Sequence, residues 1–529
     1  MKKHKLTDEF KNTHYLKLLE LEQEKVNDFK KLFEENKLSN DLLDGMFILK
    51  DNIYKIANVN EIDEIDDLDM LYEYDILGKG GQGIVYNTRD ADTVIKIALN
   101  DNKPIEDQSD IERYHKKVKN LIYLPIPIDI NIAKPISVLE NEAGYIMYLL
   151  SGMLPYAKLL PSQISKEQAE KIKIPIFLKE LDEKDRRSAI YFAYYLKSGG
   201  LRKRLFALSR LAIVLTRLHT RGLVYCDLSH NNIFMNNDEI PLIYLIDADN
   251  IEFENINKSV VYTPEYEVPE IIQGKANSIY SDIYSFAILS FLTLTTTHPF
   301  KGKGKLENDW DRENNENKEQ WELPWIEDSK DNSNESSSGL RGNLTITKEL
   351  DMLFHSIFED GKNNQYKRPT LPLWVEQFEK AATKTIKCNS CEMTYYDDVF
   401  DACPYCKNSK PQRIIVKSYY YKDNHKLKLK WYYTKEIDIK NLKDIELPNY
   451  IFKSFDILTI NDIFLDIKFA RGNKLEFVFH KKNENIIFDS KIMSTTRKPS
   501  LISKLEKGIT IIVDDSEDIT TLTEIEIKI

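Results

Sequence analysis

The spacing of apolar residues divides this 529-residue chain into regions that predict different secondary structure. Residues 1–70 begin with HYLKLLELEQEKVNDFKKLF and end with the acidic run EIDEIDDLD. In the first run, apolar residues recur on roughly one face of a helix: Leu19, Val26, Phe29 and Phe33. We therefore expect a helical N-terminal extension with an acidic linker, and a short stripe of this kind favours packing onto a neighbouring domain over a coiled coil.

Residues 71–380 change from strand-like to helical patterns. In residues 71–150, the runs DIL, IVY and VIK predict short strands, with one helix at IERYHKKVKNL. In residues 151–380, LRKRLFALSRLAIVLTRLH and SDIYSFAILSF predict long buried helices. Residues 301–342 interrupt this pattern with charged residues, Asn and Ser, which cannot bury much apolar surface. We expect this insert to be a mobile surface segment, with Trp321 and Trp325 as its anchors.

Residues 411–529 alternate apolar and polar positions with a period of two. Runs such as RIIVKSYYY, KLKLKWYY, KLEFVFH and TEIEIKI are separated by polar turns. This alternation predicts an antiparallel, sandwich-like β domain without a catalytic constellation. The chain as a whole is therefore expected to be α+β, with several cores.

Composition and charge limit the functions open to the chain. The net charge of -11 argues against a general binder of nucleic acid or anionic membranes. The first residues, MKKHKLTDEF, contain no apolar leader, and IYSFAILSFLTLTTT is too short and too rich in hydroxyl groups for a membrane span. A cytoplasmic protein is expected.

Four of the five cysteines form two CxxC pairs within residues 385–410. These are Cys388, Cys391, Cys403 and Cys406. Four thiolates in two close pairs can surround zinc tetrahedrally, so we expect a structural zinc ribbon with no open coordination position. A disulfide pairing is the alternative, and a reducing compartment disfavours it. Such ribbons contact proteins or nucleic acids, and the sequence does not choose between these partners.

A glycine-rich run between two strand-like segments predicts a phosphate-binding loop. Gly78, Gly80 and Gly83 can fold backbone over phosphates without side chains in the way, and Val85 can cover a purine. The run lies between two strands, whereas a Rossmann dinucleotide loop leads into a helix. A nucleotide with its phosphates under a hairpin is therefore the expected ligand.

Lys96 ends the apolar run VIK, where its ammonium can reach the α and β phosphates of ATP. A lysine in this role is held in place by a glutamate on the following helix. Glu112 has the more suitable spacing, and Glu106 is the second choice. The alternative for either glutamate is a solvated charge on the helix surface.

The segment VYCDLSHNNIF and the later LIDAD supply the remaining chemistry of phosphoryl transfer. Asp227 is the candidate catalytic base, while Asn232 and Asp247 offer hard oxygen ligands for Mg²⁺. Each of these residues alone could be a turn-forming Asx residue. Their shared order along the chain favours an ATP site.

With these residues in place, the segment from Tyr74 to Phe378 resembles a eukaryotic-type (Hanks-type) protein kinase domain. This resemblance implies a bilobal fold, ATP and Mg²⁺ as cofactors, and a serine or threonine of a protein as the acceptor. It also implies backbone contacts of adenine with residues from Tyr148 to Leu150, with Met147 behind them.

Further motifs carry the same resemblance outside the ATP site. TPEYEVPE is similar to the end of a kinase activation segment, where Thr263 would help to hold the catalytic Asp and Glu270 would pair with Arg368 of KRPT. SDIYSFAILSF is similar to the central helix of the larger lobe. Its Asp282 would accept backbone hydrogen bonds from the catalytic loop.

The chain departs from the usual kinase pattern at several positions. Tyr225 and Cys226 replace His-Arg before the catalytic Asp, which removes the usual docking partner of an activation-segment phosphate. Ala248 and Asp249 replace Phe-Gly after Asp247, and aspartate tolerates glycine's backbone geometry less readily. Ser229 stands where a lysine usually approaches the γ phosphate.

The cysteine pairs and the motifs DLSHNN and LIDADN are similar to those of a bacterial kinase subgroup. Its genes often lie beside those of a von Willebrand-type protein and a PP2C-type phosphatase, in clusters linked to stress or phage defence. The resemblance therefore implies both proteins as candidate partners.

Three functions remain open from the residues. The first is a protein serine/threonine kinase in which Asp227 orients the acceptor hydroxyl. The second is a nucleotide-binding pseudokinase scaffold that recruits partners through its ribbon and β domain. The third, a small-molecule phosphotransferase, shares the spacing of Asp227 and Asn232 but does not explain TPEYEVPE with KRPT.

Overall fold

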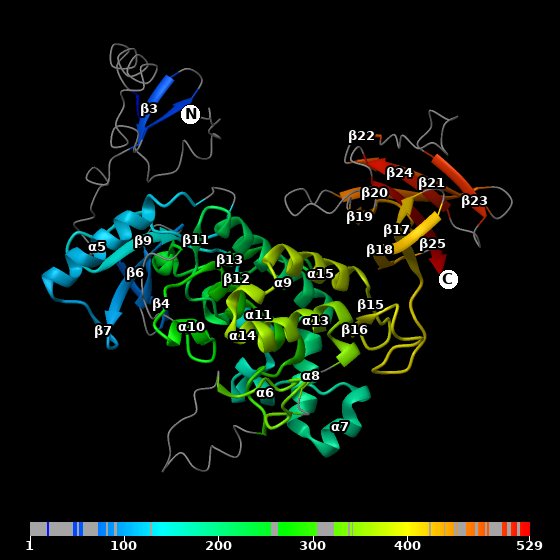
Figure 1. The fold of residues 1–529 in the computed structure, drawn as a ribbon, viewed down its shortest axis with the longest axis horizontal. Coiled ribbons are helices and arrows are strands. Elements are labelled where there is room, and N and C mark those ends of the chain that lie inside the picture. Colours follow the sequence, from blue (N-terminus) through cyan, green and yellow to red (C-terminus); the bar gives the residue numbers. More distant parts are fainter. Residues whose placement is uncertain are drawn as a thin grey trace. The chain divides into compact units, whose positions relative to one another are not determined.

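Figure 1 shows the computed structural model of the chain, which packs into two units. The first unit comprises residues 1–152 and 245–251, and the second comprises residues 153–244 and 252–529. The structure describes residues 72–80, 83–88, 92–126, 130–254, 263–303, 322–336, 339–340, 342–422, 425–438, 440–448 and 451, together with the strands β1 to β3 and β20 to β25.

The described part of residues 1–70 is a small antiparallel sheet. Strand β1 (Leu18–Glu20) and strand β2 (Met46–Leu49) both pair with β3 (Asn52–Ile56). The expected helix is therefore wrong at residues 18–20, because this apolar run finds a strand partner that its own periodicity does not reveal. Val26, Phe29, Phe33 and the acidic run lie outside the described residues.

The core of the first unit is a six-stranded antiparallel sheet covered by one helix. The strand order is β4-β5-β6-β9-β8, with the short β7 paired to β6. Its strands and helix are β4 (Tyr72–Lys79), β5 (Gly83–Thr88), β6 (Thr93–Asn100), β7 (Lys103–Pro104), β8 (Ser137–Val138), β9 (Gly144–Tyr148) and α5 (Gln108–Ile122). The central position of β6 explains its nearly continuous burial, which an apolar run permits.

Helix α5 turns its apolar stripe towards this sheet. The Asp107 side chain caps its first turn by accepting hydrogen bonds from the backbone N–H groups of residues 109 and 110. The buried positions of the helix recur with helical spacing: Ile111, His115, Val118 and Leu121. The remaining positions, including both acidic residues of the helix, lie outside this buried stripe.

Helices dominate the first part of the second unit. They are α6 (Lys166–Glu170), α7 (Lys179–Lys184), α8 (Arg186–Lys197), α9 (Gly200–His219), α10 (Pro269–Ile272), α11 (Ile279–Thr295), α13 (Lys348–His355), α14 (Gly361–Asn363) and α15 (Leu371–Thr383). Short strands lie between them, namely β10 (Leu154–Pro155), β11 (Leu223–Val224), β12 (Ile233–Met235), β13 (Ile243–Leu245) and β14 (Glu252–Phe253). Helix α11 is buried from Ser281 to its end at Thr295, as its apolar composition predicts. None of the helices among the described residues has the length and apolar character to cross a bilayer.

The insert at residues 301–342 is not a mobile segment throughout. Residues 304–321, which include Trp321, lie outside the described part. In the described half, Trp325 is 1% exposed and packs edge-on against Phe291. Asn334 is fully buried and donates hydrogen bonds to the carbonyl oxygens of Phe300 and Pro324. The expected anchoring by Trp325 is confirmed. The expectation of a mobile segment is wrong for residues 322–336, because the average composition does not reveal the bonded amide of Asn334.

The C-terminal strands form two antiparallel sheets after a small hairpin. The hairpin pairs β15 (Thr385–Lys387) with β16 (Thr394–Tyr396). One sheet has the order β18-β17-β25-β24, and the other has the order β19-β20-β21-β22 with β23 on β21. These strands are β17 (Arg413–Lys422), β18 (His425–Glu436), β19 (Ile445–Pro448), β20 (Asp462–Ala470), β21 (Lys474–Lys481), β22 (Glu484–Asn485), β23 (Ser500–Lys504), β24 (Ile509–Asp515) and β25 (Ile519–Lys528).

Candidate active site and metal centre

The glycine-rich hairpin joins β4 to β5. Gly78 lies opposite Val85 in the strand register, and the turn is closed by a hydrogen bond from the Gly80 N–H to the Gly83 carbonyl, 2.9 Å. A Cβ atom at Gly83 would lie 2.9 Å from the backbone carbonyl oxygen of Ile97 and 2.9 Å from Lys96 Cε, so a side chain at this position would collide with the neighbouring strand. Gly78 and Gly80 have open space around them and are exposed.

The candidate adenine-contacting residues lie at the end of β9 and directly after it. Met147 is 7% exposed in a cluster with Val94 and Tyr145, and Val85 and Leu150 pack against this cluster. Tyr148 is exposed, and the Leu149 N–H already donates to the Asp92 carbonyl, 2.9 Å. The apolar surface at Val85 and Met147 therefore suits the flat face of a purine.

Lys96 is buried in the middle of β6, between Val85 and Tyr145 on the neighbouring strands. Its Nζ lies 2.9 Å from Asp247 Oδ1 and 3.2 Å from Asp249 Oδ1. Burial acts to lower the pKa of Lys96, but the two carboxylates outweigh it and raise that pKa above its ordinary value. The lysine is therefore a permanent cation, held at a fixed place.

The expected partner of Lys96 was Glu112, and this expectation is wrong. Glu112 lies on the exposed side of α5, and Glu106, the second choice, is also exposed. The helix register is the reason: α5 buries Ile111 and His115, and Glu112, one residue after Ile111, is turned away from this buried side. The number of residues between Lys96 and Glu112 does not determine which side of α5 faces Lys96, so the sequence could not reveal this.

Asp247 begins a sharp change of chain direction after β13. Its backbone is in the left-handed region, with φ 52° and ψ 48°, and a 3₁₀ turn, η6 (Ala248–Asn250), follows it. Asp249, at the position of the usual glycine, is not among the described residues with positive φ. The strained residue is Asp247 itself, so aspartate fits at 249 without the penalty that the sequence suggested.

Asp227 and its neighbours form a polar cluster in the second unit. Asp227 is 5% exposed, and its carboxylate accepts hydrogen bonds from Thr263 Oγ1, 2.7 Å, and Asn232 Nδ2, 3.1 Å. Asn232, at the end of η5 (His230–Asn232), also donates to the Asp227 carbonyl, 2.8 Å. Because its amide nitrogen faces Asp227, the Asn232 oxygen is the atom that can bind a cation.

Asp282, in the first turn of α11, positions the segment that leads to Asp227. Its carboxylate accepts hydrogen bonds from the backbone N–H groups of Tyr225, 2.7 Å, and Cys226, 2.9 Å. His219 Nε2 lies 2.9 Å from the same carboxylate. Cys226 has a left-handed backbone, φ 71°, so these bonds stabilise a conformation that a cysteine rarely adopts.

Glu270 and Arg368 form a buried, bidentate ion pair, with N–O distances of 2.6 and 2.8 Å. The guanidinium also donates to the carbonyls of Gly361 and Tyr280, and it lies over the Tyr284 ring. This pair joins α10, α11 and the chain before α15.

Ser229 is fully buried, and its side chain is uncharged, so this position places no cation beside Asp227.

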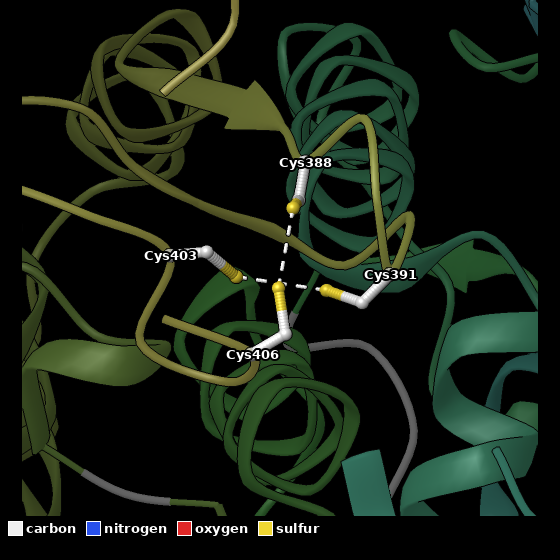
Figure 2. Close-up of side chains that lie close together, drawn as sticks. All are labelled: Cys388, Cys391, Cys403 and Cys406. Carbon is white, nitrogen blue, oxygen red and sulfur yellow. Dashed lines mark hydrogen bonds between the residues drawn. The ribbon is translucent and has the colours of Figure 1, made fainter. Parts of the chain in front are cut away.

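The four cysteines lie together, with all four sulfur atoms within 4.8 Å of one another (Figure 2). The distances from Cys388 to Cys406 and from Cys391 to Cys403 are both 3.5 Å, and no disulfide links them. Zinc–thiolate bonds of about 2.3 Å place tetrahedral sulfurs roughly 3.8 Å apart. The four sulfurs therefore suit one tetrahedral ion.

The two knuckles have the same backbone design. The residue after the second cysteine of each pair is left-handed, Glu392 at φ 61° and Lys407 at φ 64°. The backbone N–H of Ser390 donates to the Cys388 sulfur, 3.4 Å, and the side-chain amide of Asn408 donates to the Cys406 sulfur, 3.3 Å. Although burial opposes it, such bonds lower the pKa of Cys406 to about 7. Burial instead raises the pKa of Cys403 to about 11 and raises that of Cys391 further. Without a metal, the thiolate, which is the metal-binding form, is therefore favoured at Cys406 and disfavoured at these two cysteines.

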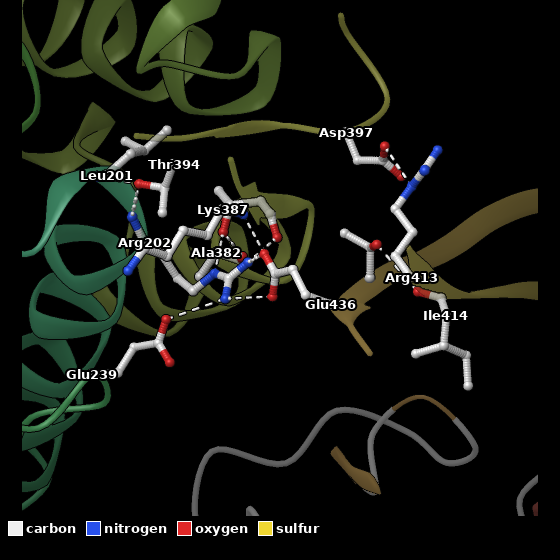
Figure 3. A network of polar contacts seen from close by, with 12 residues as sticks. Leu201, Arg202, Glu239, Ala382, Lys387, Thr394, Asp397, Arg413, Ile414 and Glu436 are labelled. Atoms are coloured by element: carbon white, nitrogen blue, oxygen red, sulfur yellow. Dashed lines mark hydrogen bonds and ion pairs between the residues drawn. The ribbon is translucent and has the colours of Figure 1, made fainter. Parts of the chain in front are cut away.

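Side chains near the ribbon join it to the helices and to the β domain (Figure 3). Arg202 of α9 donates to Glu436 of β18, 2.6 Å, and to the Thr385 carbonyl of β15, 2.6 Å. Thr394 Oγ1 accepts from the N–H groups of Leu201, 2.7 Å, and Arg202, 3.2 Å. The ribbon thus caps the N-terminus of α9. Sequence patterns gave no signal for these contacts, because they join residues about 180 to 235 positions apart.

The comparisons with known proteins agree with this geometry for part of the chain. Residues 201–377 match the family model of the protein kinase domain. Ribosomal protein S6 kinase alpha-6 of Mus musculus is 39% identical over 106 residues, which cover 19% of this chain and 14% of that protein. Serine/threonine-protein kinase D2 of Rattus norvegicus is 22% identical over 250 residues, which cover 46% of this chain and 25% of that protein. The chain thus spans a quarter or less of these relatives.

Proposed function

We propose that this chain is a protein kinase that transfers the γ-phosphate of ATP to serine or threonine hydroxyl groups of a protein. The observation that carries the proposal is the cluster of Asp227, Thr263 and Asn232. A buried carboxylate held by two side chains can orient an acceptor hydroxyl and accept its proton. The match of residues 201–377 to the protein kinase domain supports the same reaction.

The first unit supplies the groups that suit the nucleotide. Lys96 would neutralise phosphate charge, and the backbone at Gly78 and Gly80 would cover the phosphates. Asp247 would contribute an oxygen ligand to Mg²⁺, which supplies charge neutralisation when it is bound, and Asn232 of the second unit is the other proposed ligand. Thr263 next to the carboxylate of Asp227 supports serine or threonine as the acceptor.

A transfer assay tests this proposal. Purified chain with Mg²⁺ and γ-labelled ATP should phosphorylate itself or a generic protein substrate, and Asp227→Ala should lower the rate about 10²- to 10⁴-fold. Lys96→Met should have a comparable effect. Equal rates for wild type and a folded Asp227→Ala variant would refute transfer by this chain.

One observation favours a second function, that of a pseudokinase scaffold. Ser229 is fully buried where kinases usually place a lysine, so no cation at this position reaches a γ phosphate. On this proposal, ATP binds without transfer, Asp227→Ala leaves function intact, and loss of the ribbon cysteines abolishes it. Binding of Mg·ATP without measurable transfer would favour this alternative.

We also propose that the four cysteines bind a structural zinc ion. All four ligands come from the chain, three of them are buried, and no coordination position is left for a substrate. The ribbon would then contact proteins, while a nucleic-acid contact stays a lesser proposal. A cytoplasmic location, expected from the sequence, stays a proposal. Two further proposals rest on the resemblance alone: a role in bacterial stress or phage defence, and phosphatase or von Willebrand-type partners.

A further inference from the structure

Lys96 has two acidic partners on the chain segment after β13. Asp247 and Asp249 both lie within ion-pair distance of its ammonium, at 2.9 and 3.2 Å. The two carboxylates differ in their surroundings, because the Asp247 side chain is 23% exposed and that of Asp249 only 8%. One partner can therefore meet solvent and ligands, and the other is enclosed.

Helix α5 offers no carboxylate to this lysine among its described residues. Its acidic residues are Asp110, which pairs with Arg113 at the surface, and Glu112, which is exposed. The residue of α5 that lies close enough to affect the charge of Lys96 is Tyr114, whose hydroxyl is buried. The usual source of a fixed anion for this lysine is thus missing.

The two acids cannot share one role if Asp247 binds Mg²⁺. When a carboxylate coordinates a divalent cation, the positive charge of the cation offsets the negative charge of the carboxylate. The carboxylate then attracts a nearby ammonium less strongly. A buried ammonium without a partner is costly, and it would move towards the phosphates or the solvent. Lys96 therefore needs a second anion that stays with it when the metal binds.

We propose that Asp249 is the positioning residue of Lys96 and replaces the missing helix glutamate, which leaves Asp247 for the metal. The proposal rests on the kinase function proposed above. The local backbone makes it feasible: the left-handed Asp247 followed by the 3₁₀ turn η6 brings carboxylates two positions apart onto the same ammonium. An aspartate at this position has a purpose that glycine could not serve.

The first test removes the charge at each candidate partner. Asp249→Asn should lower kcat about 10- to 100-fold, because Lys96 would then turn to Asp247 and both phosphate and metal would be misplaced. The free Mg²⁺ concentration for half-maximal activity should rise several-fold, a change that a merely structural residue would not produce. Glu112→Gln should stay within twofold of wild type. Unchanged kcat and Mg²⁺ dependence in Asp249→Asn, or a large loss in Glu112→Gln, would overturn the proposal.

A second test moves the carboxylate to the helix. In the background Asp249→Gly, the additional change Tyr114→Glu places an acid on the side of α5 that faces Lys96. Higher transfer rates than in Asp249→Gly alone support the proposal, and equal or lower rates in a folded double variant count against it. Thermal unfolding without nucleotide shows whether each variant is folded.

A parallel measurement separates this proposal from the proposed function. The increase in melting temperature on adding Mg·ATP reports the nucleotide site without any transfer. Should wild type transfer no more phosphate than Asp227→Ala, the kinase function fails. The positioning role would still be supported if Asp249→Asn reduced this increase and Glu112→Gln did not, and it would be rejected if both variants kept it.

Discussion

Asp282 and Asp397 are both buried carboxylates of the second unit, and they hold their surroundings in different ways. Asp282 is 2% exposed, and its partners are two backbone N–H groups and His219. Asp397 is 3% exposed, and its partners are the side chains of Lys410, 3.1 Å, Arg413, 2.9 Å, and Tyr432, 2.7 Å. Figure 3 shows the pair of Asp397 and Arg413 beside the ribbon.

This difference suggests that Asp282 positions the loop before Asp227, whereas Asp397 holds the ribbon and the β domain together. Hydrogen bonds to backbone N–H groups fix the path of the chain itself, and at Asp282 that path leads directly to Asp227. Ion pairs between long side chains fix the position of one element relative to another, but they do not fix the backbone conformation within either element. We therefore expect changes at Asp282 to affect catalysis most, and changes around Asp397 to affect the stability of the ribbon and the β domain.

Removal of the proposed zinc ion should have the largest effect, because it should disrupt the surroundings of Asp397 and leave those of Asp282 in place. Structural zinc sites in small modules bind with apparent free energies on the order of 10 kcal/mol, so a chelator or Cys403→Ser should unfold the ribbon. The Asp397 pairs and the cap of α9 would be lost with it. Zinc content by atomic spectroscopy and thermal unfolding measure this effect. The ribbon hypothesis fails if zinc is absent from the purified chain, or if a chelator leaves its melting temperature unchanged.

Asp397→Asn should destabilise the second unit by about 3 kcal/mol, because Lys410 and Arg413, whose side chains are only 16% and 13% exposed, lose their charged partner. The kcat of the folded protein should change little. Denaturant unfolding and kinetics below the melting temperature measure the two effects. Asp398→Asn is the matched control, because Asp398 is the next residue and pairs with Lys384 at a more exposed site. An equal loss in both variants would contradict the special role of Asp397.

Asp282→Asn should lower kcat by about 10²-fold, since an amide can accept only one of the two backbone hydrogen bonds and the loop before Asp227 would shift. The melting temperature should fall less than for Asp397→Asn. Steady-state kinetics with wild type in parallel measure this change. Asp351→Asn is the control for losing a helix N-terminal charge, because Asp351 lies in the first turn of α13 and its side chain is 44% exposed. A stable Asp282→Asn variant with normal kcat would remove the contrast on which the comparison depends.

Thr394→Val should cost about 1 kcal/mol, the usual effect of losing a helix cap. Valine keeps the shape but removes the oxygen that accepts from Leu201 and Arg202. Chemical denaturation measures the change, with Thr394→Ser as the variant that keeps the hydroxyl. Equal stability of all three proteins would show that the ribbon does not support α9 through this contact.

Acid sensitivity at Glu359 should be the smallest effect. Partial burial opposes ionisation of Glu359, but hydrogen bonds from Ser329 and His355 outweigh it and lower the pKa to about 2. A carboxyl group with a lowered pKa stabilises the fold above its ordinary pKa and loses this contribution as the pH falls from about 4.5 to about 2. Melting temperatures should therefore decrease less between these pH values in Glu359→Gln than in wild type. The contribution of Glu359 to the free energy of unfolding should be only about 1 kcal/mol, because nearby solvent screens its charge. Parallel pH profiles would contradict this assignment.

The sequence by itself determined the elements whose residues act locally. The two CxxC pairs predict a metal site because their ligands lie close along the chain, and the long apolar repeats predict α9 and α11. The glycine-rich run, Lys96, Asp227, Asn232 and Asp247 could be listed as candidates because phosphoryl transfer needs those residue types in that order. Trp325 was correctly expected to anchor the insert, whereas the polar composition of the insert gave no sign that Asn334 is buried and hydrogen-bonded.

Only the tertiary structure decided which of these groups meet. The exposure of Glu112 depends on the rotation of α5 about its axis, and one step along a helix turns a side chain by about 100°. The pairing of Asp249 with Lys96 depends on the left-handed backbone at Asp247. The buried pairs of Asp397, and the cap that Thr394 provides to α9, join residues distant in sequence. Such contacts depend on distances of a few ångströms between separate elements, and local patterns in a sequence do not contain those distances.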